Sequence, residues 1–224
     1  MPRSARVVIP GLAHHITQRG NRRQQTFFCD SDYELYQRIL AEEASRGGLG
    51  IASYCLIFNH VHLNAIPARE DTFARVLGTV HRRYTAFVNA REGWKGHLWQ
   101  GRFYSCPMDE RHTVAGSRYT EWNPCRAGLT ARPEDWPFSS ARAHLGIARD
   151  LVLDACGVEL PGVDWRELLA NDVPSADATS LRKHALNGRP LGDARWVREL
   201  EARTGRILTA RRRGPPSGRT LRAA

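Results

Sequence analysis

Two histidines, His60 and His62, alternate with the apolar residues Val61 and Leu63 in a stretch that predicts a strand over residues 60–66. Alternate side chains of a strand share a face, so the two imidazoles stand side by side and the apolar pair faces the other way. Two neutral imidazoles in this arrangement supply half of a divalent-metal site. The alternative is a pair of half-buried histidines that are hydrogen-bonded to their neighbours.

The rest of the site must come from elsewhere in the chain. Asn64 and Ala65 exclude the hydrolytic zinc pattern HxHxDH, which needs Asp and His at these positions. A helix is predicted over residues 109–122, with Asn123 at its end. Tyr119 and Asn123 are four residues apart and therefore share a face of this helix. Asn offers a carbonyl oxygen as a metal ligand, and Tyr offers a hydroxyl that can act as a nucleophile on a phosphodiester. A divalent cation would assist that attack.

The elements that would position these groups follow an α+β order. Hydrophobic patterning predicts strands over residues 12–18, 51–57, 60–66 and 102–108. A first helix is expected from a capping box at Ser31–Glu34 to Gly47. A second is expected from Asp71 onward, with Tyr84 on its apolar stripe, and a third over residues 109–122. Four strands with helices on one face predict a ferredoxin-like antiparallel sheet.

The charge of the chain indicates a polyanionic partner. The 224 residues include 33 Lys and Arg against 23 Asp and Glu, a net charge of +10, and only Lys95 and Lys183 are lysines. Residues 1–29 and 206–224 carry arginines and no carboxylate. Arginine suits phosphate, so nucleic acid is favoured over the alternative of a solvated tail.

Composition excludes several other classes of protein. No apolar run approaches the roughly 18 residues of a membrane span, and the N-terminus lacks a signal-peptide pattern, so a cytoplasmic location away from membranes is expected. Five scattered cysteines without a Cys-x-x-Cys pair indicate reduced thiols.

Several blocks carry a family resemblance. Cys55–Leu63, with the sequence CLIFNHVHL, resembles the signature of single-tyrosine HUH transposases, in which U is a hydrophobic residue. Residues 17–22, 97–103, 118–129 and 136–141 resemble further blocks of that family. The similarity is greatest to the REP-associated tyrosine transposases and covers about residues 1–145. Several ordered motifs are far more specific than one His-x-His.

The resemblance implies a ferredoxin-like domain that cleaves and rejoins single-stranded DNA near small palindromic hairpins. It implies that His60, His62 and Asn123 bind Mg²⁺ or Mn²⁺, and that Tyr119 becomes joined to a 5′ phosphate. Asn64 lies where relatives usually have an apolar residue, and the sequence leaves open whether it is a ligand, supports one or is a sign of drift. Gly116 is also unusual, because glycine disfavours the helix of the tyrosine.

Other residues are assigned from their types and positions. The candidates for DNA contact are Arg19, Asn21, Arg22, Arg23, Trp99, Gln100, Arg102 and Arg126. For Trp99, stacking on an extruded base and pinning a loop to the core are both open. Only one of His14 and His15 can face the site, and a structural role is expected for each. Tyr104 is the best rival nucleophile.

The expected organisation is a catalytic domain over residues 1–145, a helical appendage over 146–205 and a basic, disordered tail over 206–224. The helices of the appendage are expected over residues 163–169, 180–186 and 193–202. The leading hypothesis is a DNA strand transferase acting on REP-like palindromes, as a monomer or homodimer. The alternatives are a hairpin-binding protein that does not cut and a metal-dependent single-strand nuclease.

Overall fold

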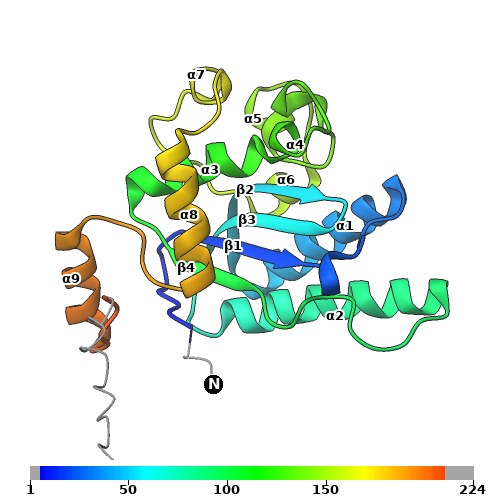
Figure 1. Cartoon of the computed structure of the whole chain (residues 1–224), viewed down its shortest axis with the longest axis horizontal. Coiled ribbons are helices and arrows are strands. Elements are labelled where there is room, and N and C mark those ends of the chain that lie inside the picture. The colour runs from blue at the N-terminus through cyan, green and yellow to red at the C-terminus, as the bar shows by residue number, and fades with distance from the viewer. Residues whose placement is uncertain (1–5, 210–224) are drawn as a thin grey trace, which may run out of the picture.

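The computed structural model describes residues 6–209 and contains one four-stranded antiparallel sheet. Its strands are β1 (His14–Arg19), β2 (Leu49–Ile57), β3 (His60–Pro67) and β4 (Tyr104–Pro107). Their order in space is β2-β3-β1-β4 (Figure 1). With α1 (Asp30–Gly47) between β1 and β2 and α2 (Thr72–Glu92) between β3 and β4, the chain has the β-α-β-β-α-β order of the ferredoxin-like fold. This confirms the predicted fold class.

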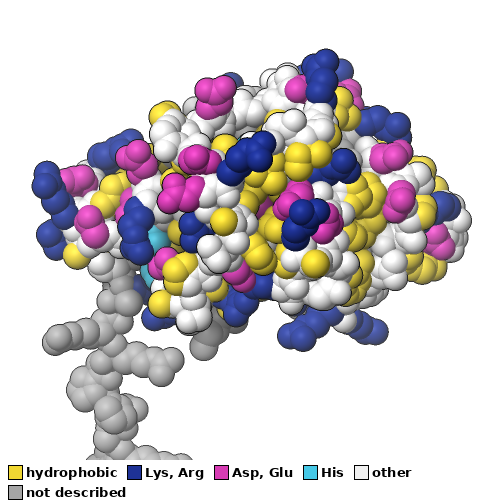
Figure 2. Space-filling model, turned by 90° about the horizontal axis from the view of Figure 1, so that it is seen from above, with side chains coloured by type: hydrophobic (Ala, Val, Ile, Leu, Met, Phe, Trp, Pro, Cys, Tyr) yellow, Lys and Arg dark blue, Asp and Glu magenta, His cyan; other side chains and the backbone are white. Residues whose placement is uncertain are grey.

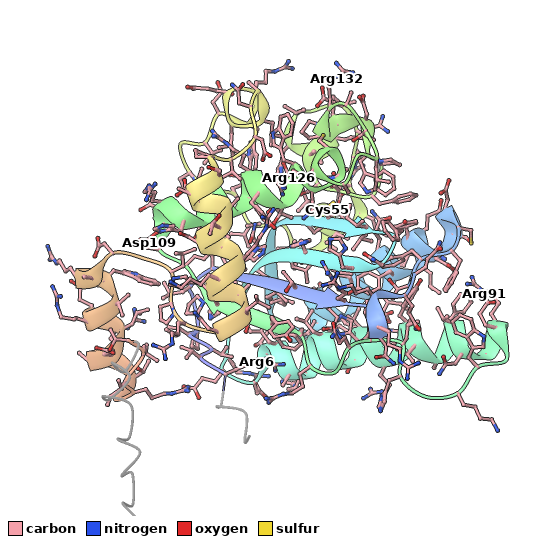
Figure 3. All side chains as sticks on the ribbon, viewed as in Figure 1. Arg6, Cys55, Arg91, Asp109, Arg126 and Arg132 are labelled. Carbon is pink, nitrogen blue, oxygen red and sulfur yellow. The ribbon has the colours of Figure 1, made fainter. Side chains whose placement is uncertain are left out.

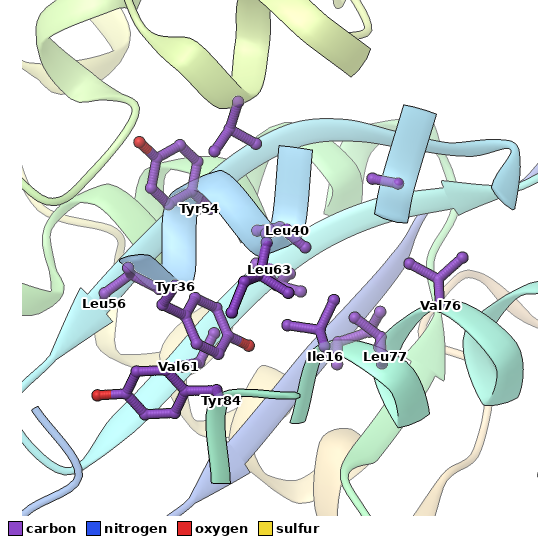
Figure 4. Close-up of a cluster of buried hydrophobic side chains, with 14 of the residues drawn as sticks. Ile16, Tyr36, Leu40, Tyr54, Leu56, Val61, Leu63, Val76, Leu77 and Tyr84 are labelled. Atoms are coloured by element: carbon purple, nitrogen blue, oxygen red, sulfur yellow. The ribbon is translucent and has the colours of Figure 1, made fainter. Parts of the chain in front are cut away.

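One face of the sheet packs on α1 and α2. The apolar side of β3, including Val61 and Leu63, meets Leu40 of α1 and Leu77 of α2 in a fully buried cluster (Figure 4). Tyr84 of α2 belongs to this core, as its place on the apolar stripe predicts, and its hydroxyl donates to the carbonyl of Thr26 at 2.7 Å. Burial of these side chains supplies the main driving force for forming the two layers.

The opposite face of the sheet is also covered, which corrects the expectation of helices on one face only. It packs on α3 (Glu110–Glu121), α4 (Asn123–Arg126) and α8 (Ser175–Asn187). Asp109 caps α3 by accepting a hydrogen bond from the backbone N–H of His112 at 2.8 Å. Polar side chains of this face pair with Ser117 and Thr120 of α3, whereas α8 packs through an apolar cluster that includes Leu181 and Met108.

The start of α1 also differs from the prediction. Its N-cap is Cys29, and no Ser31–Glu34 capping box forms. Asp32 instead accepts a hydrogen bond from the backbone N–H of Phe28 at 2.8 Å and pairs with Arg91 at the end of α2. An ion pair between the buried Asp32 and the exposed Arg91 therefore takes the place of a local cap.

The C-terminal helices pack against the sheet and the helices around it. The remaining elements are η1 (Asn21–Arg23), η2 (Pro133–Asp135), α5 (Ala141–His144), α6 (Leu151–Cys156), α7 (Trp165–Leu169) and α9 (Ala194–Thr204). Helix α6 packs on α1 and β2, and α8 packs on β4, β1 and α3. Helix α8 begins at Ser175, earlier than expected, and the short helices α5 and α6 have no counterpart among the predicted elements.

The block over residues 136–141 runs along β2 at the edge of the sheet. The indole N–H of Trp136 donates to the carbonyl of Leu56 at 2.9 Å, and the backbone N–H of Leu56 donates to the carbonyl of Phe138 at 2.9 Å. Covering an edge strand in this way satisfies its backbone groups. The predicted tail beyond residue 209 lies outside the described residues. Within residues 6–209 no helix has the length and apolar content needed to cross a membrane.

Candidate active site

A cavity of about 560 Å³ lies between the polar face of the sheet and the helices α3, α4 and α8. Its lining includes His60 and His62 of β3, Tyr119 of α3, and Asn123 at the start of α4. The histidine pair of the strand and the Tyr–Asn pair that starts on α3 therefore lie in one cavity, as the sequence predicts. What these side chains can do chemically depends on the groups that surround them.

The two histidines of β3 lie against each other and toward the tyrosine. The ring centroids of His60 and His62 are 4.9 Å apart, and those of His62 and Tyr119 are 5.7 Å apart. The side chain of His60 is hydrogen-bonded to that of Asn123. Burial, with the nearby charge of Arg19, lowers the pKa of His60 to about 4. Burial also lowers the pKa of His62 well below its ordinary value, so both imidazoles are neutral at pH 7.

A buried histidine on β1 supports His62 from behind. Nδ1 of His15 lies 2.9 Å from Oδ1 of Asn64, and Nε2 of His15 lies 3.4 Å from Nδ1 of His62. Because Oδ1 of Asn64 can only accept, Nδ1 of His15 is the donor and its Nε2 is the acceptor. Nδ1 of His62 must then carry its proton, and Nε2 of His62 keeps a lone pair. The hydrogen bonds thus leave Nε2 of His62 able to bind a cation.

Asn64 is the origin of this orientation. Its side chain is fully buried, and its Nδ2 donates to hydroxyl oxygens of Ser53 at 2.7 Å, Thr120 at 3.2 Å and Ser117 at 3.4 Å. With both its oxygen and its nitrogen engaged, Asn64 supports the site and does not act as a ligand. A Cβ at Gly116 would lie 3.3 Å from Oδ1 of Asn64. The unusual glycine in α3 therefore gives the helix room to approach Asn64.

Tyr119 is held between two arginines. Its ring is 5% exposed, and the guanidinium carbon of Arg126 lies 4.0 Å from the ring centroid. Arg126, which Figure 3 labels, also donates to the backbone carbonyl of Tyr119 and pairs with Asp172 at 2.5 Å. Nε of Arg182, on α8, donates to the Tyr119 hydroxyl at 3.2 Å. The hydroxyl of the candidate nucleophile is thus the acceptor of a charged hydrogen bond.

The predicted DNA-contacting residues separate into two groups. Arg19, Arg23, Gln100 and Arg126 line the cavity that contains Tyr119. The others, Asn21, Arg22, Trp99 and Arg102, are not among its lining residues. On the face that Figure 2 shows, arginines and lysines are interspersed with acidic side chains and form no continuous basic patch. Because they line the cavity that contains Tyr119, Arg19, Arg23 and Arg126 are the predicted contacts best placed to meet a phosphate at the candidate nucleophile.

Trp99 does not present a ring face to solvent. It is 6% exposed, and its ring centroid lies 4.9 Å from that of His81 and 6.0 Å from that of Tyr84. Of the two alternatives for this residue, the structure supports pinning of the loop over residues 93–103 to the core. Base stacking on Trp99 stays a prediction, and it would require this buried ring to become exposed.

Two residues of the site were not assigned to it from the sequence. His15 was given only a structural role, although its alternation with His14 allowed it to face the site. It does so, because β1 pairs His15 with Asn64 and Thr17 with His62. Arg182 lies 63 residues beyond Tyr119, in a helix with no motif, so no signal in the sequence marked it.

Comparison with known proteins identifies the family of the chain and a solved structure with the same fold. The family model described as "Transposase IS200 like" matches residues 9–123, a little over half of the chain. A solved structure of a REP-associated tyrosine transposase bound to a REP hairpin shares the fold, with a TM-score of 0.53, 18% identity, and coverage of 78% of this chain and 100% of that chain. A crystal structure of a proposed transposase from Deinococcus radiodurans R1 overlaps with a TM-score of 0.38, at 19% identity over 57% of this chain and 92% of that chain.

No curated protein sequence matches the chain. The family match covers all four residues that the fold brings together, His60, His62, Tyr119 and Asn123. The protein belongs to the family of IS200-like transposases.

Proposed function

We propose that this transposase cleaves and rejoins single-stranded DNA beside palindromic hairpins, with Tyr119 as the nucleophile. The observation that carries the proposal is the shared cavity, in which a tyrosine hydroxyl, two neutral imidazoles and a carboxamide lie together with arginines. The fold-level match to a structure of a transposase bound to a REP hairpin supports a hairpin as the partner. The motifs shared with the REP-associated tyrosine transposases support the same partner.

The donor groups of the cavity fit a divalent cation. His62 keeps the lone pair of Nε2 because its Nδ1 is engaged by His15. Nδ1 of His60 lies 2.6 Å from Oδ1 of Asn59, so the same reasoning leaves Nε2 of His60 free of a proton. The Asn123 carboxamide lies in the same cavity and is hydrogen-bonded to the side chain of His60, so its oxygen can serve as a third donor.

We propose that His60, His62 and Asn123 hold Mg²⁺ or Mn²⁺. Two nitrogen donors and one amide oxygen leave several positions for water or phosphate oxygens, as such hard cations require. When bound, the cation supplies polarisation of a phosphoryl oxygen. The nucleophile and the groups that position the DNA are side chains of the protein.

In the proposed step the Tyr119 oxygen attacks phosphorus. The bond between that oxygen and phosphorus forms while the bond from phosphorus to the 3′ oxygen breaks. The phenol proton passes to water, and the departing 3′ oxygen takes up a proton from water. The reverse reaction rejoins the strand. One phosphodiester replaces another, so the exchange is nearly balanced and needs no nucleotide triphosphate.

The proposal is tested by looking for the covalent link. The full-length protein is incubated with Mn²⁺ and a pool of 3′-labelled single-stranded oligonucleotides that carry randomised hairpins and flanks. A denaturing gel then separates label that is bound to the protein. We expect a labelled adduct, and sequencing of the retained DNA identifies the preferred substrate.

Two variants make the result specific. Tyr119→Phe removes the hydroxyl and keeps the ring, so the adduct is lost while native-gel binding remains. Tyr104→Phe is the matched control, because Tyr104 lines the same cavity, and it retains the adduct. Cleavage that survives Tyr119→Phe would favour the metal-dependent nuclease. Binding without any cleavage would favour a hairpin-binding protein.

A further inference from the structure

We propose that Arg182 of α8 is a catalytic residue that stabilises negative charge on the Tyr119 oxygen during both cleavage and rejoining. The inference rests on the proposed function and extends it to a helix outside residues 9–123, the part that the family model matches. It follows from one contact, the hydrogen bond from Nε of Arg182 to the Tyr119 hydroxyl at 3.2 Å.

Helix α8 is fixed to the catalytic part of the fold, so the contact is not that of a loose appendage. Leu181, next to Arg182, is fully buried in a cluster that also contains Tyr119 and Met108. After the helix, the backbone N–H of Leu191 donates to the carbonyl of Pro107 at the end of β4 at 2.8 Å. The helix is therefore anchored at its middle and just beyond its end, and Arg182 enters the cavity from a rigid element (Figure 1).

The charge of Arg182 is available for this role, whereas that of Arg126 is largely committed. Arg126 is paired with Asp172 at 2.5 Å and donates to the backbone carbonyl of Tyr119. Among the described residues no ion pair joins Arg182 to a carboxylate, and its side chain is partly open to solvent. A guanidinium has five N–H donors in a fixed fork. One already reaches the Tyr119 oxygen, and others remain for a phosphate oxygen.

Both directions of the reaction place charge where Arg182 donates. In cleavage, the Tyr119 oxygen becomes negative as its proton passes to water and its bond to phosphorus forms. In rejoining, the attacking 3′ hydroxyl loses its proton to water and bonds to phosphorus, while the Tyr119 oxygen carries charge as its bond to phosphorus breaks and then takes up a proton from water. A charged hydrogen bond that is already in place stabilises this oxygen in each transition state. Arg182 is permanently protonated, so it donates and does not accept the phenol proton.

The test measures the two half-reactions of the full-length protein with the oligonucleotide that the adduct assay selects. Arg182→Ala is compared with Arg182→Lys and with Lys183→Ala, which removes one positive charge from the next position of the same helix. Single-turnover cleavage is followed by adduct formation. Rejoining is followed by adding a 3′-hydroxyl oligonucleotide to the isolated adduct. Thermal melting and oligonucleotide affinity are measured for every variant.

We expect Arg182→Ala to lower both rates about 100-fold, the usual effect of removing one donor from developing charge, while affinity changes less than about threefold. Arg182→Lys is expected to recover at least about tenfold of that loss, and Lys183→Ala is expected to react like the wild type. Unchanged or faster cleavage by Arg182→Ala would overturn the inference, since a guanidinium that merely shields Tyr119 would give that result. Absence of any adduct in the wild type would instead reject the proposed function.

Discussion

His15 and Asn64 face each other across paired positions of β1 and β3, and Nδ1 of His15 lies 2.9 Å from Oδ1 of Asn64. Through Nε2 of His15 this contact reaches Nδ1 of His62 at 3.4 Å. A fully buried amide two residues along β3, on the same face of the sheet, thereby decides which nitrogen of a candidate metal ligand carries the proton. The polar chain from Asn64 to His62 is as much a part of the site as the groups that line the cavity.

Replacing Asn64 with leucine tests that chain. Asn64→Leu keeps a similar volume but leaves Nδ1 of His15 and the hydroxyls of Ser53 and Thr120 without their partner. We expect a loss of about 1–3 kcal/mol in the free energy of unfolding and a 10–100-fold weaker affinity for Mn²⁺. Urea denaturation and calorimetric titration measure the two quantities.

The control for this variant is Asn171→Leu, which changes an exposed asparagine. It is expected to leave both the stability and the Mn²⁺ affinity near their wild-type values. Unaltered Mn²⁺ affinity in Asn64→Leu would show that the protonated nitrogen of His62 is not set by Asn64.

Much of this fold follows from the sequence, and the reason is local patterning. Alternation along residues 60–66 places His60 and His62 on one face and Val61 and Leu63 on the other, as the structure has them. Asn64 and His15, by contrast, meet only because β1 and β3 pair in one register. A register between strands that are far apart in the chain is set by the whole sheet, and no single stretch encodes it.

The same distinction explains the helices. Asp109 and Asp193 cap α3 and α9 through local hydrogen bonds, and the predicted starts of these helices are correct. The ion pair of the buried Asp32 with Arg91 joins the ends of two helices 59 residues apart, so the predicted local cap at Ser31–Glu34 is wrong. The contact of Arg182 with Tyr119 is likewise long-range, and no spacing rule in the sequence could find it.

The Asp32–Arg91 pair predicts a defined loss of stability at neutral pH. Although burial by itself opposes the charge, hydrogen bonds from Arg91 and from the Phe28 N–H hold the pKa of Asp32 below its ordinary value of 3.8. We expect Asp32→Asn to lower the free energy of unfolding by about 2 kcal/mol at pH 7, as for the loss of a hydrogen bond to a charged group. Glu92→Gln, which alters an exposed partner of Arg91, should change it by less than about 0.5 kcal/mol.

The pH dependence of that difference has a fixed sign. A carboxyl with a lowered pKa adds stability above its unfolded pKa and loses that contribution as the pH falls through its folded pKa. The difference in free energy of unfolding between wild type and Asp32→Asn, measured by urea denaturation from pH 7 to pH 3, should therefore become smaller below about pH 4. A gap that stays constant over this range would mean that charge on Asp32 is not its source.

His14 predicts a second, separate dependence on pH. Its Nδ1 is 2.8 Å from the Leu12 carbonyl and its Nε2 accepts from the Ile9 N–H at 3.2 Å, a pattern that only neutral imidazole satisfies. Burial lowers the pKa of His14 from 6.5 to about 4. The unfolded chain then takes up a proton first on acidification, so stability is full above pH 6.5 and falls toward pH 4.

The slope from one such histidine reaches about 1.4 kcal/mol per pH unit. His15 and His60, whose pKa values burial also lowers to about 4, add to it. Urea denaturation at pH 7, 6 and 5 measures how steeply the free energy of unfolding falls with pH. The slope for His14→Gln should be smaller than that of the wild type by the amount that one bound proton contributes, up to about 1.4 kcal/mol per pH unit. Identical slopes for the two proteins would contradict the neutral state of His14.

DNA binding should depend on which arginine of the η1 turn is changed. Both arginines are exposed, but only Arg23 lines the cavity. Both have left-handed backbone, with φ of 64° and 53°, so replacement with alanine has a similar conformational effect at each. Fluorescence anisotropy with single-stranded DNA at several salt concentrations should show Arg23→Ala weakening the affinity and reducing the salt slope by about 0.7–1. Equal effects of Arg22→Ala would place the DNA backbone outside the cavity.

The most direct measurement of the central claim is the site of covalent attachment. The wild-type protein is allowed to react with the selected oligonucleotide and Mn²⁺, digested with a protease and nuclease, and analysed by mass spectrometry. We predict a single modified peptide that carries a 5′-linked nucleotide on Tyr119 and that is missing from Tyr119→Phe. A nucleotide attached to Tyr104 or another residue, or strand cleavage with no modified peptide, would contradict it.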